Sequence, residues 1–137
     1  MKTKIAIQMD DIKKIDYDFD SSFVIGLEGQ KRNYELFYYH PNDIFIDSGV
    51  VKAKGFFLEL IDQKVNYFRF LSEKIEVKLE EIKFIFLRQD PPFNMHYITS
   101  TYLLDCLPKS TIVINNSTAV RIAAEKILPY KFTQFMA

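Results

Sequence analysis

The stretch from residue 84 to residue 93, Phe-Ile-Phe-Leu-Arg-Gln-Asp-Pro-Pro-Phe, constrains the fold of this chain more than any other segment. Its four leading apolar residues are typical of a short strand that is buried on both faces of a sheet. The two prolines then remove two amide donors and fix φ, so the strand cannot continue through them. We therefore predict a buried strand over 84–87 that delivers Arg88 and Asp90 to a rigid loop. The alternative is a solvated Arg-Asp pair on a stiff loop.

Length and composition favour a single domain over residues 1–137, because a chain of this size buries enough apolar surface to fold without disulfides or metals. Lys plus Arg and Asp plus Glu number 18 each, which disfavours binding to nucleic acid or to an anionic membrane. Cys106 is the single cysteine, and every apolar run is shorter than the ~18 residues that span a bilayer. These features predict a cytoplasmic protein.

The first forty residues predict a βαβ unit. Residues 4–9 are predicted to form a first strand, which Asp10-Asp11 ends with two carboxylates. Asp20-Ser21-Ser22 has helix N-cap chemistry, and the helix that follows ends in the polar residues 30–33. A second strand over 34–39 then completes a crossover that should be right-handed.

The remaining chain predicts a β-hairpin insertion at about 40–83 and a return to the parallel sheet. Apolar residues around the turn at 48–49, and again near 67–70, are typical of hairpin strands. After the 84–87 strand we expect a helix from about 94 to 107, a strand over 111–114 and a helix from 119 to about 128. The fold class is α/β, with a mostly parallel sheet flanked by helices.

Three of the predicted strands end in polar clusters that begin at Asp10, Arg88 and Asn115. If these strands are parallel neighbours, their clusters meet at one edge of the sheet. Ligands of open α/β sheets bind there, where the strand order reverses, so we place the site between the Asp10 and Arg88 loops. The guanidinium of Arg88 suits a carboxylate, and Asp10 and Asp90 suit an ammonium group. An amino acid or peptide ligand fits this mixture, and an internal Arg-Asp network is the alternative.

The sequence gives little support for nucleotide binding, metal binding or nucleophilic catalysis. The chain has neither a Gly-x-Gly-x-x-Gly fingerprint nor a P-loop, and its two histidines and one cysteine lack metal-ligand spacing. We therefore predict no metal site. Ser21 and Ser22 are read as a helix cap rather than as nucleophiles, although the free amides at that helix end could receive a substrate carboxylate.

The residues also match a known family in order along the chain. Arg-Gln-Asp-Pro-Pro-Phe at 88–93 is the most specific element, and it is joined by Met9-Asp10, residues 20–23, Asn33-Tyr34-Glu35-Leu36 and Glu125-Lys126. With these motifs the chain resembles the N-terminal region of bacterial glutathione synthetase. The resemblance implies a Rossmann-like pre-ATP-grasp domain, with the ATP-grasp domain absent from this chain.

The resemblance further implies part of an enzyme that joins γ-glutamylcysteine to glycine with ATP and magnesium, through an acyl phosphate. It places Lys126 near the ATP phosphates in the complete enzyme, whereas the alternative is an exposed helical lysine. Asp10, Ser21, Ser22, Arg88, Asp90 and Asn115 are the candidate substrate-binding residues. Catalytic residues, ATP and Mg²⁺ are not expected on this chain alone, which should be inactive. The expected partners are the two substrates, glutathione, the ATP-grasp domain and further copies in a homo-oligomer.

Two other functions remain open from the sequence. One is a free-standing module that binds a ligand or oligomerises without catalysis. The other is the N-terminal domain of a different ATP-grasp carboxylate-amine ligase, with the same fold and another acceptor.

Overall fold

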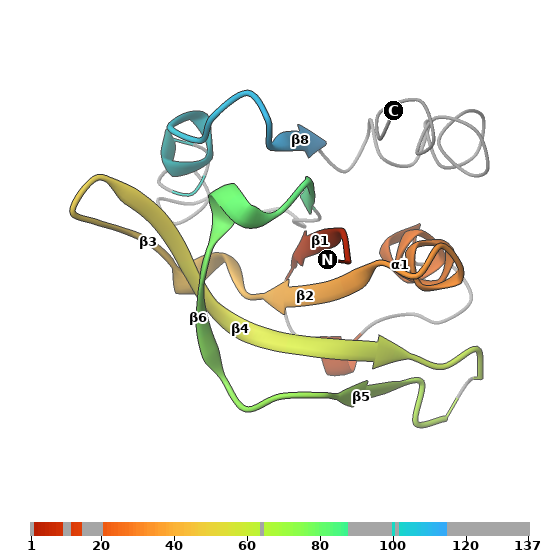
Figure 1. The fold of residues 1–137 in the computed structure, drawn as a ribbon. Coiled ribbons are helices and arrows are strands. Elements are labelled where there is room, and N and C mark those ends of the chain that lie inside the picture. The colour runs from red at the N-terminus through yellow and green to blue at the C-terminus, as the bar shows by residue number, and fades with distance from the viewer. Residues whose placement is uncertain are drawn as a thin grey trace.

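The computed structural model describes residues 2–9, 12–14, 21–63, 65–87, 100 and 102–114, and for residues 21–24 it describes only the backbone. These residues form one eight-stranded sheet with a single long helix, α1 (Figure 1). The α/β class predicted from the sequence is confirmed.

Half of the sheet is parallel. Its strands lie in the order β2-β1-β7-β8 and are β1 (Lys4–Gln8), β2 (Glu35–Tyr39), β7 (Phe84–Leu87) and β8 (Ile112–Ile114). The helix α1 (Ser21–Lys31) connects β1 to β2. The predicted strands at 4–9, 34–39, 84–87 and 111–114 and the first helix are therefore confirmed. The 84–87 strand has the predicted bounds, and each of the other three strands is one residue shorter than predicted. The helices predicted near 94–107 and 119–128 lie largely outside the described residues, although Ser100 and residues 102–105 are helical.

The other half is antiparallel and is organised by one long strand, β4 (Val50–Leu60). The second half of β4 pairs with β2 and with β5 (Phe68–Phe70), and its first half pairs with β3 (Ile44–Asp47) and β6 (Ile75–Lys78). Short 3₁₀ helices occur at Ile12–Lys14, Pro41–Asp43 and Leu79–Glu81. The sheet is therefore mixed and not mostly parallel as predicted, because β4 enters it beside β2.

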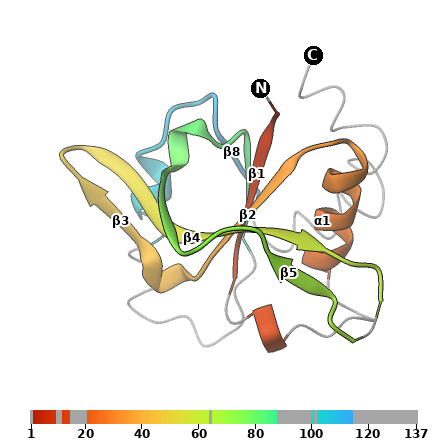
Figure 2. The ribbon, with the colours of Figure 1, turned by 60° about the horizontal axis from the view of Figure 1, so that its bottom comes forward.

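The strand β4 changes partners near Gly55. Figure 2 shows β4 running from the β3 hairpin on one side of the molecule to β5 near α1 on the other. A Cβ atom at Gly55 would overlap the carbonyl oxygen of Tyr38 and lie 2.8 Å from the Cβ of Tyr39. Glycine is required here because the backbone of β2 approaches too closely for any side chain.

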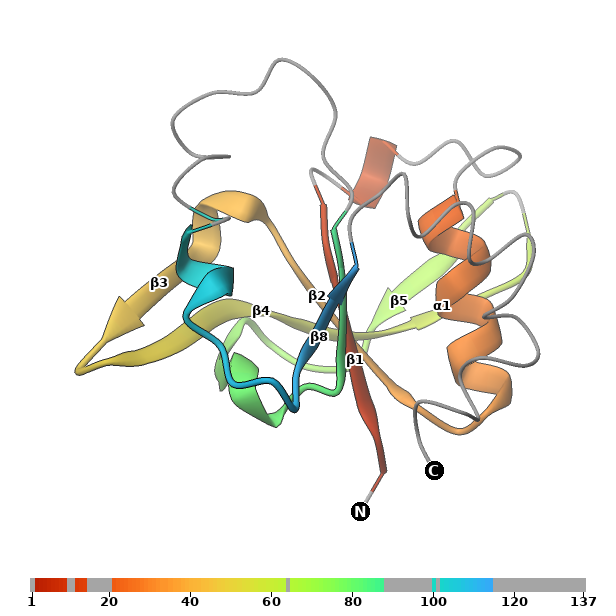
Figure 3. The same cartoon turned by 90° about the horizontal axis from the view of Figure 1, so that it is seen from above.

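Apolar clusters cover both faces of the parallel strands. On one face α1 packs through Ile25 and brings Gly26 and Gly29 against Leu60 and Ile5, whose methyl groups occupy the space of the missing side chains. The opposite face packs against the 3₁₀ helix at 79–81, strands β3 and β4, and Leu104 of the helical segment. Figure 3 shows α1 and this helical segment on opposite sides of the central strands. Burial on both faces explains the unbroken apolar run at 84–87.

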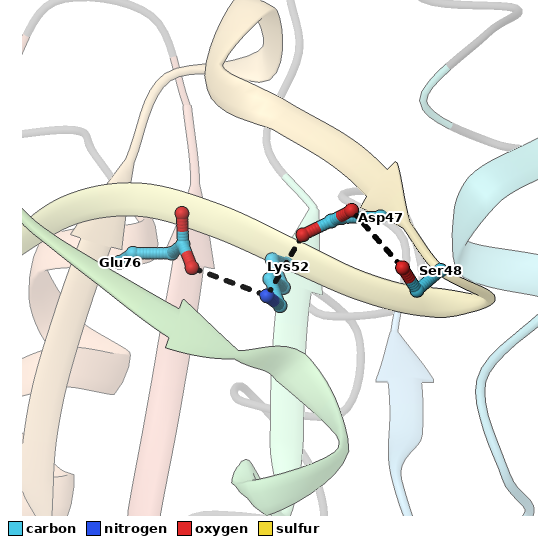
Figure 4. A network of polar contacts seen from close by, with 4 residues as sticks. All are labelled: Asp47, Ser48, Lys52 and Glu76. Atoms are coloured by element: carbon cyan, nitrogen blue, oxygen red, sulfur yellow. Dashed lines mark hydrogen bonds and ion pairs between the residues drawn. The ribbon is translucent and has the colours of Figure 1, made fainter.

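A lysine on the solvent face of the β3-β4-β6 ladder joins three strands. The Nζ of Lys52 lies 3.3 Å from Asp47 Oδ2 and 3.2 Å from Glu76 Oε2 (Figure 4). Hydrogen bonds to Glu76 and then to Asp47 raise the pKa of Lys52 above its ordinary value. The charged form is thus favoured in the folded state.

We expect Lys52→Met to lower the melting temperature modestly at pH 7. A raised folded-state pKa contributes stability below the unfolded-state pKa of about 10.4, and this contribution is lost as the pH rises through the folded-state value. The deficit of the variant should therefore shrink in melts above pH 11, and also in 1 M NaCl. Lys78 lies directly opposite Lys52 in the register, so Lys78→Met removes a like charge and should cost nothing. An equal fall in melting temperature for Lys52→Met and Lys78→Met would contradict a stabilising role for the ion pairs of Lys52.

Candidate functional site: the carboxyl edge of the parallel strands

The carboxyl ends of the parallel strands meet around β1. Gln8, the last residue of β1, is the register partner of both Tyr39 on β2 and Leu87 on β7. On β8, Ile114 pairs with Phe86 of β7. Since β2 and β7 flank β1, and each is reached by its own crossover, the strand order reverses at β1. The sequence analysis placed the site where the strand order reverses, and the described strands confirm that the order reverses at β1, which lies between β2 and β7.

The predicted site residues follow these strand ends in the sequence. Asp10, Arg88, Asp90, Asn115 and Lys126 all lie outside the described residues. Ser21 and Ser22 form the first turn of α1, and their side chains are likewise outside the description. Arg88 directly follows Leu87, and Asn115 directly follows Ile114. The roles of all the predicted site residues named in this paragraph stay predictions.

The first loop is anchored on both of its sides. Before it, the amide of Met9 donates to the carbonyl oxygen of Tyr39 over 3.2 Å. After it, buried Ile12 is held twice: its amide donates to the hydroxyl of Tyr38 over 3.3 Å, and its carbonyl oxygen accepts from the hydroxyl of Tyr67 over 2.6 Å. These contacts fix Met9 and Ile12, which flank residues 10 and 11 in the sequence, against β2 and the β4–β5 connection.

Buried polar side chains lie under this edge, and the sequence interpretation missed them. Gln8 and Ser100 are both fully buried, and the Nε2 of Gln8 donates to the Oγ of Ser100 over 3.3 Å. Tyr39 is only 1% exposed, and its hydroxyl has no hydrogen-bond partner within the described part of the chain. The one available signal was a glutamine directly after the apolar run at 5–7.

Burial also fixes the protonation state of Tyr39. Desolvation raises the pKa of its phenol above the ordinary value, so the group stays neutral at physiological pH. A neutral phenol donates or accepts a hydrogen bond but does not supply a negative charge. Tyr39 is therefore not suited to act as a general base.

The cavities in the described part of the chain lie away from the carboxyl edge of the parallel strands. One of about 570 Å³ is lined by residues from the start of β2, the end of α1, β4 and the chain after β5: Lys2, Gln30, Asn33, Tyr34, Glu35, Leu36, Phe57, Leu58, Glu59, Leu71 and Ser72. It lies at the amino end of β2, opposite the predicted site. Gln30 in its wall is a structural residue, because its side-chain amide bonds both the N–H and the carbonyl of Leu60.

The described residues hold no group of three or more His, Cys, Asp or Glu side chains that could bind a metal ion. None of their helices is long and apolar enough to cross a membrane.

Comparison with known proteins decides the family. Residues 3–121 match the model of the prokaryotic glutathione synthetase N-terminal domain. The chain belongs to this family. The match contains all strands of the sheet and extends past the end of β8. The resemblance read from the 88–93 motif and its companions is confirmed.

Curated relatives agree with this assignment. The domain is 41% identical over 136 residues to a glutathione synthetase of Brucella melitensis, which covers 99% of the chain and 43% of the relative. It is 43% identical over 132 residues to a glutathione synthetase of Agrobacterium fabrum, and 35% identical over 132 residues to one of Vibrio cholerae. These two matches cover 96% of the chain and 41% of each relative. The domain thus spans less than half the length of the curated relatives it matches.

Proposed function

We propose that this domain forms one wall of the substrate site in a glutathione synthetase, the ATP-dependent ligase that joins γ-glutamylcysteine to glycine. The pairing of Gln8 with both Tyr39 and Leu87 supports the proposal, because the carboxyl ends of β1, β2 and β7 lie at one edge of the sheet and the sequence continues from two of them toward residues 10 and 88. Family membership supplies the reaction. In this proposal residues 1–137 are one Rossmann-like, pre-ATP-grasp domain. Only the parallel half of the sheet, β2-β1-β7-β8, is Rossmann-like in this proposal.

Within the proposed site, substrate recognition rests on charge. Arg88 directly follows Leu87, the last residue of β7, in the sequence, and we propose its guanidinium as the bidentate partner of a substrate carboxylate. Asp10 and Asp90 are the proposed acceptors for the γ-glutamyl ammonium group. Ser21 and Ser22, at the start of α1, and Asn115 complete the proposed substrate-binding set. These groups orient and bind, and we assign no proton transfer to them.

The nucleotide belongs to another part of the proposed enzyme. The described residues offer no metal-ligand cluster, so we assign them no magnesium contact. We propose that the ATP-grasp domain supplies the magnesium site and most ATP contacts, with Lys126 reaching the phosphates from this domain. When bound, ATP supplies the activation of the γ-glutamylcysteine carboxylate. A cytoplasmic homo-oligomer is proposed for the complete enzyme.

The proposal is tested by Arg88→Ala in the complete polypeptide that carries this domain. We expect kcat/KM for γ-glutamylcysteine to fall about ten- to hundredfold, because one charge-assisted contact is worth about 1.5 to 3 kcal/mol. The melting temperature should change little. The matched control is Arg69→Ala, since Arg69 is an exposed arginine on β5 that pairs with Glu59. Unchanged kinetics in Arg88→Ala, or equal losses in both variants, would remove Arg88 from the site.

A further inference from the structure

The cavity of about 570 Å³ at the amino end of β2 lies where β2 and β4 stop pairing. The ladder between these strands ends at the pair of Leu36 and Leu58, whereas β4 runs on to Leu60. The amide of Glu35 donates over 2.8 Å to the carbonyl oxygen of Thr3, which precedes β1. The start of β2 is thus bonded toward β1, and a space remains between it and the end of β4.

Hydrogen bonds hold the walls of this cavity in place. The side-chain amide of Gln30, on α1, takes the place of the missing strand and bonds both the N–H and the carbonyl of Leu60. On the opposite wall, the Oγ of Ser72 accepts from the amide of Phe57 over 3.0 Å. The amide of Leu71 donates over 2.8 Å to the carbonyl oxygen of Phe57. A cavity whose walls are fixed beforehand binds a ligand at a low entropic cost.

One carboxylate in the wall is not neutralised by any described residue. Two glutamates line the cavity, Glu35 and Glu59. The Oε1 of Glu59 lies 3.0 Å from the Nη2 of Arg69. The half-buried side chain of Glu35 makes no ion pair or hydrogen bond with the described residues. Its register partner on β1, Lys4, lies 3.9 Å from Glu81 instead. Glu35 is therefore available to a cation that enters the cavity.

Apolar side chains line the same cavity, and one of them is open to water. Leu71 is 57% exposed, although it is a large apolar residue, and Phe57 beside it is half-buried. A ligand seated there removes apolar surface from water on both sides of the contact. Lys2 is the one cation among the described lining residues, and it is exposed, so water already solvates its charge.

We propose that this cavity binds a small ligand that carries a primary ammonium group on an apolar body. The ammonium group pairs with Glu35, and the apolar body lies against Phe57 and Leu71. The volume of about 570 Å³ falls within the range of about 300 to 1,000 Å³ that is typical of small-molecule sites. The cavity lies at the amino end of β2, away from the proposed substrate site, and its occupation requires no step of the proposed reaction.

The test measures the binding of three probes to the complete polypeptide by ligand-observed NMR titration at low salt and pH 7. Phenethylamine, 2-phenylethanol and 3-phenylpropanoate share a phenyl ring and a two-carbon linker, and differ in the charge of the end group. We expect phenethylamine to bind with a Kd on the order of 1 mM, about five- to tenfold tighter than 2-phenylethanol. The anionic 3-phenylpropanoate should bind most weakly. Added NaCl should weaken only phenethylamine.

Two variants assign the binding to this cavity. Glu35→Gln should weaken phenethylamine about five- to tenfold and leave 2-phenylethanol unchanged. Its control is Glu73→Gln, which makes the same charge change at an exposed glutamate outside the described lining. Leu71→Ser should weaken both of these probes, and Val65→Ser, at a 72% exposed residue outside that lining, should weaken neither. Leu71 and Val65 are exposed, so the melting temperature should hardly change.

Several results would overturn the proposal. They are equal affinity for the three probes, tighter binding of 3-phenylpropanoate, equal losses in Glu35→Gln and Glu73→Gln, and no binding of phenethylamine at about 10 mM. All of these are binding measurements that need no turnover. A wild-type protein that makes no glutathione would refute the proposed function, and the titrations would still decide whether the cavity is a binding site.

Discussion

Leu87→Asp is expected to unfold the domain. Leu87 is 8% exposed and packs in the apolar cluster of the sheet face that also holds Ile85 and Leu104. An ionised carboxylate there has no cation among the described members of that cluster, and an unpaired buried charge costs about 3 to 5 kcal/mol. Since domains of this size are stable by about 5 to 15 kcal/mol, a loss of this size removes a large share of the stability and unfolds a domain near the lower end of that range. Urea denaturation followed by circular dichroism measures the change.

Leu87→Met is the control for this variant. It keeps the volume and the apolar character of the side chain, so it should cost less than about 1.5 kcal/mol. A cooperative Leu87→Asp transition near the wild-type midpoint would show that the end of β7 is open to solvent. In that case the carboxyl end of β7 would not be buried between the two apolar clusters of the sheet.

Gly55→Ala is expected to have the second large effect. The added Cβ would overlap the carbonyl oxygen of Tyr38, which is backbone and cannot rotate away. The pairing of β2 with β4 must then open, at a cost of at least about 1 to 3 kcal/mol. The melting temperature of the domain reports the loss, and hydrogen exchange should locate it in β2 and β4.

Gly49→Asn is the comparison for Gly55→Ala. Gly49 lies in the β3–β4 turn with φ +80° and has nothing within 4 Å of an added Cβ. Asparagine adopts this conformation more readily than other side chains, so the loss should stay under about 1 kcal/mol. Similar losses at the two glycines would mean that close backbone contact is not what requires Gly55.

Local patterns explain why the parallel half of the fold could be predicted. The run at 84–87 is bounded by charge and proline, and α1 ends near basic Lys31, so each element carries its own boundary signals. The antiparallel half could not be predicted in this way. The sequence analysis predicted hairpin strands around the turn at 48–49 and near 67–70, without the strand pairing beyond Gly55. The strand β4 continues to Leu60, because its second half is stabilised by pairing with β2 and β5 and not by any local signal.

By itself, the sequence determined the family and the α/β class. The 88–93 motif and the order of strand and helix signals are local properties, and they sufficed to identify an α/β domain of the glutathione synthetase family. Only the tertiary structure decided which strands flank β4, why Gly55 must lack a side chain, and that Gln8 meets Ser100. The reason is physical: strand pairing and buried hydrogen bonds join residues far apart in the chain, and their stability depends on both partners arriving together.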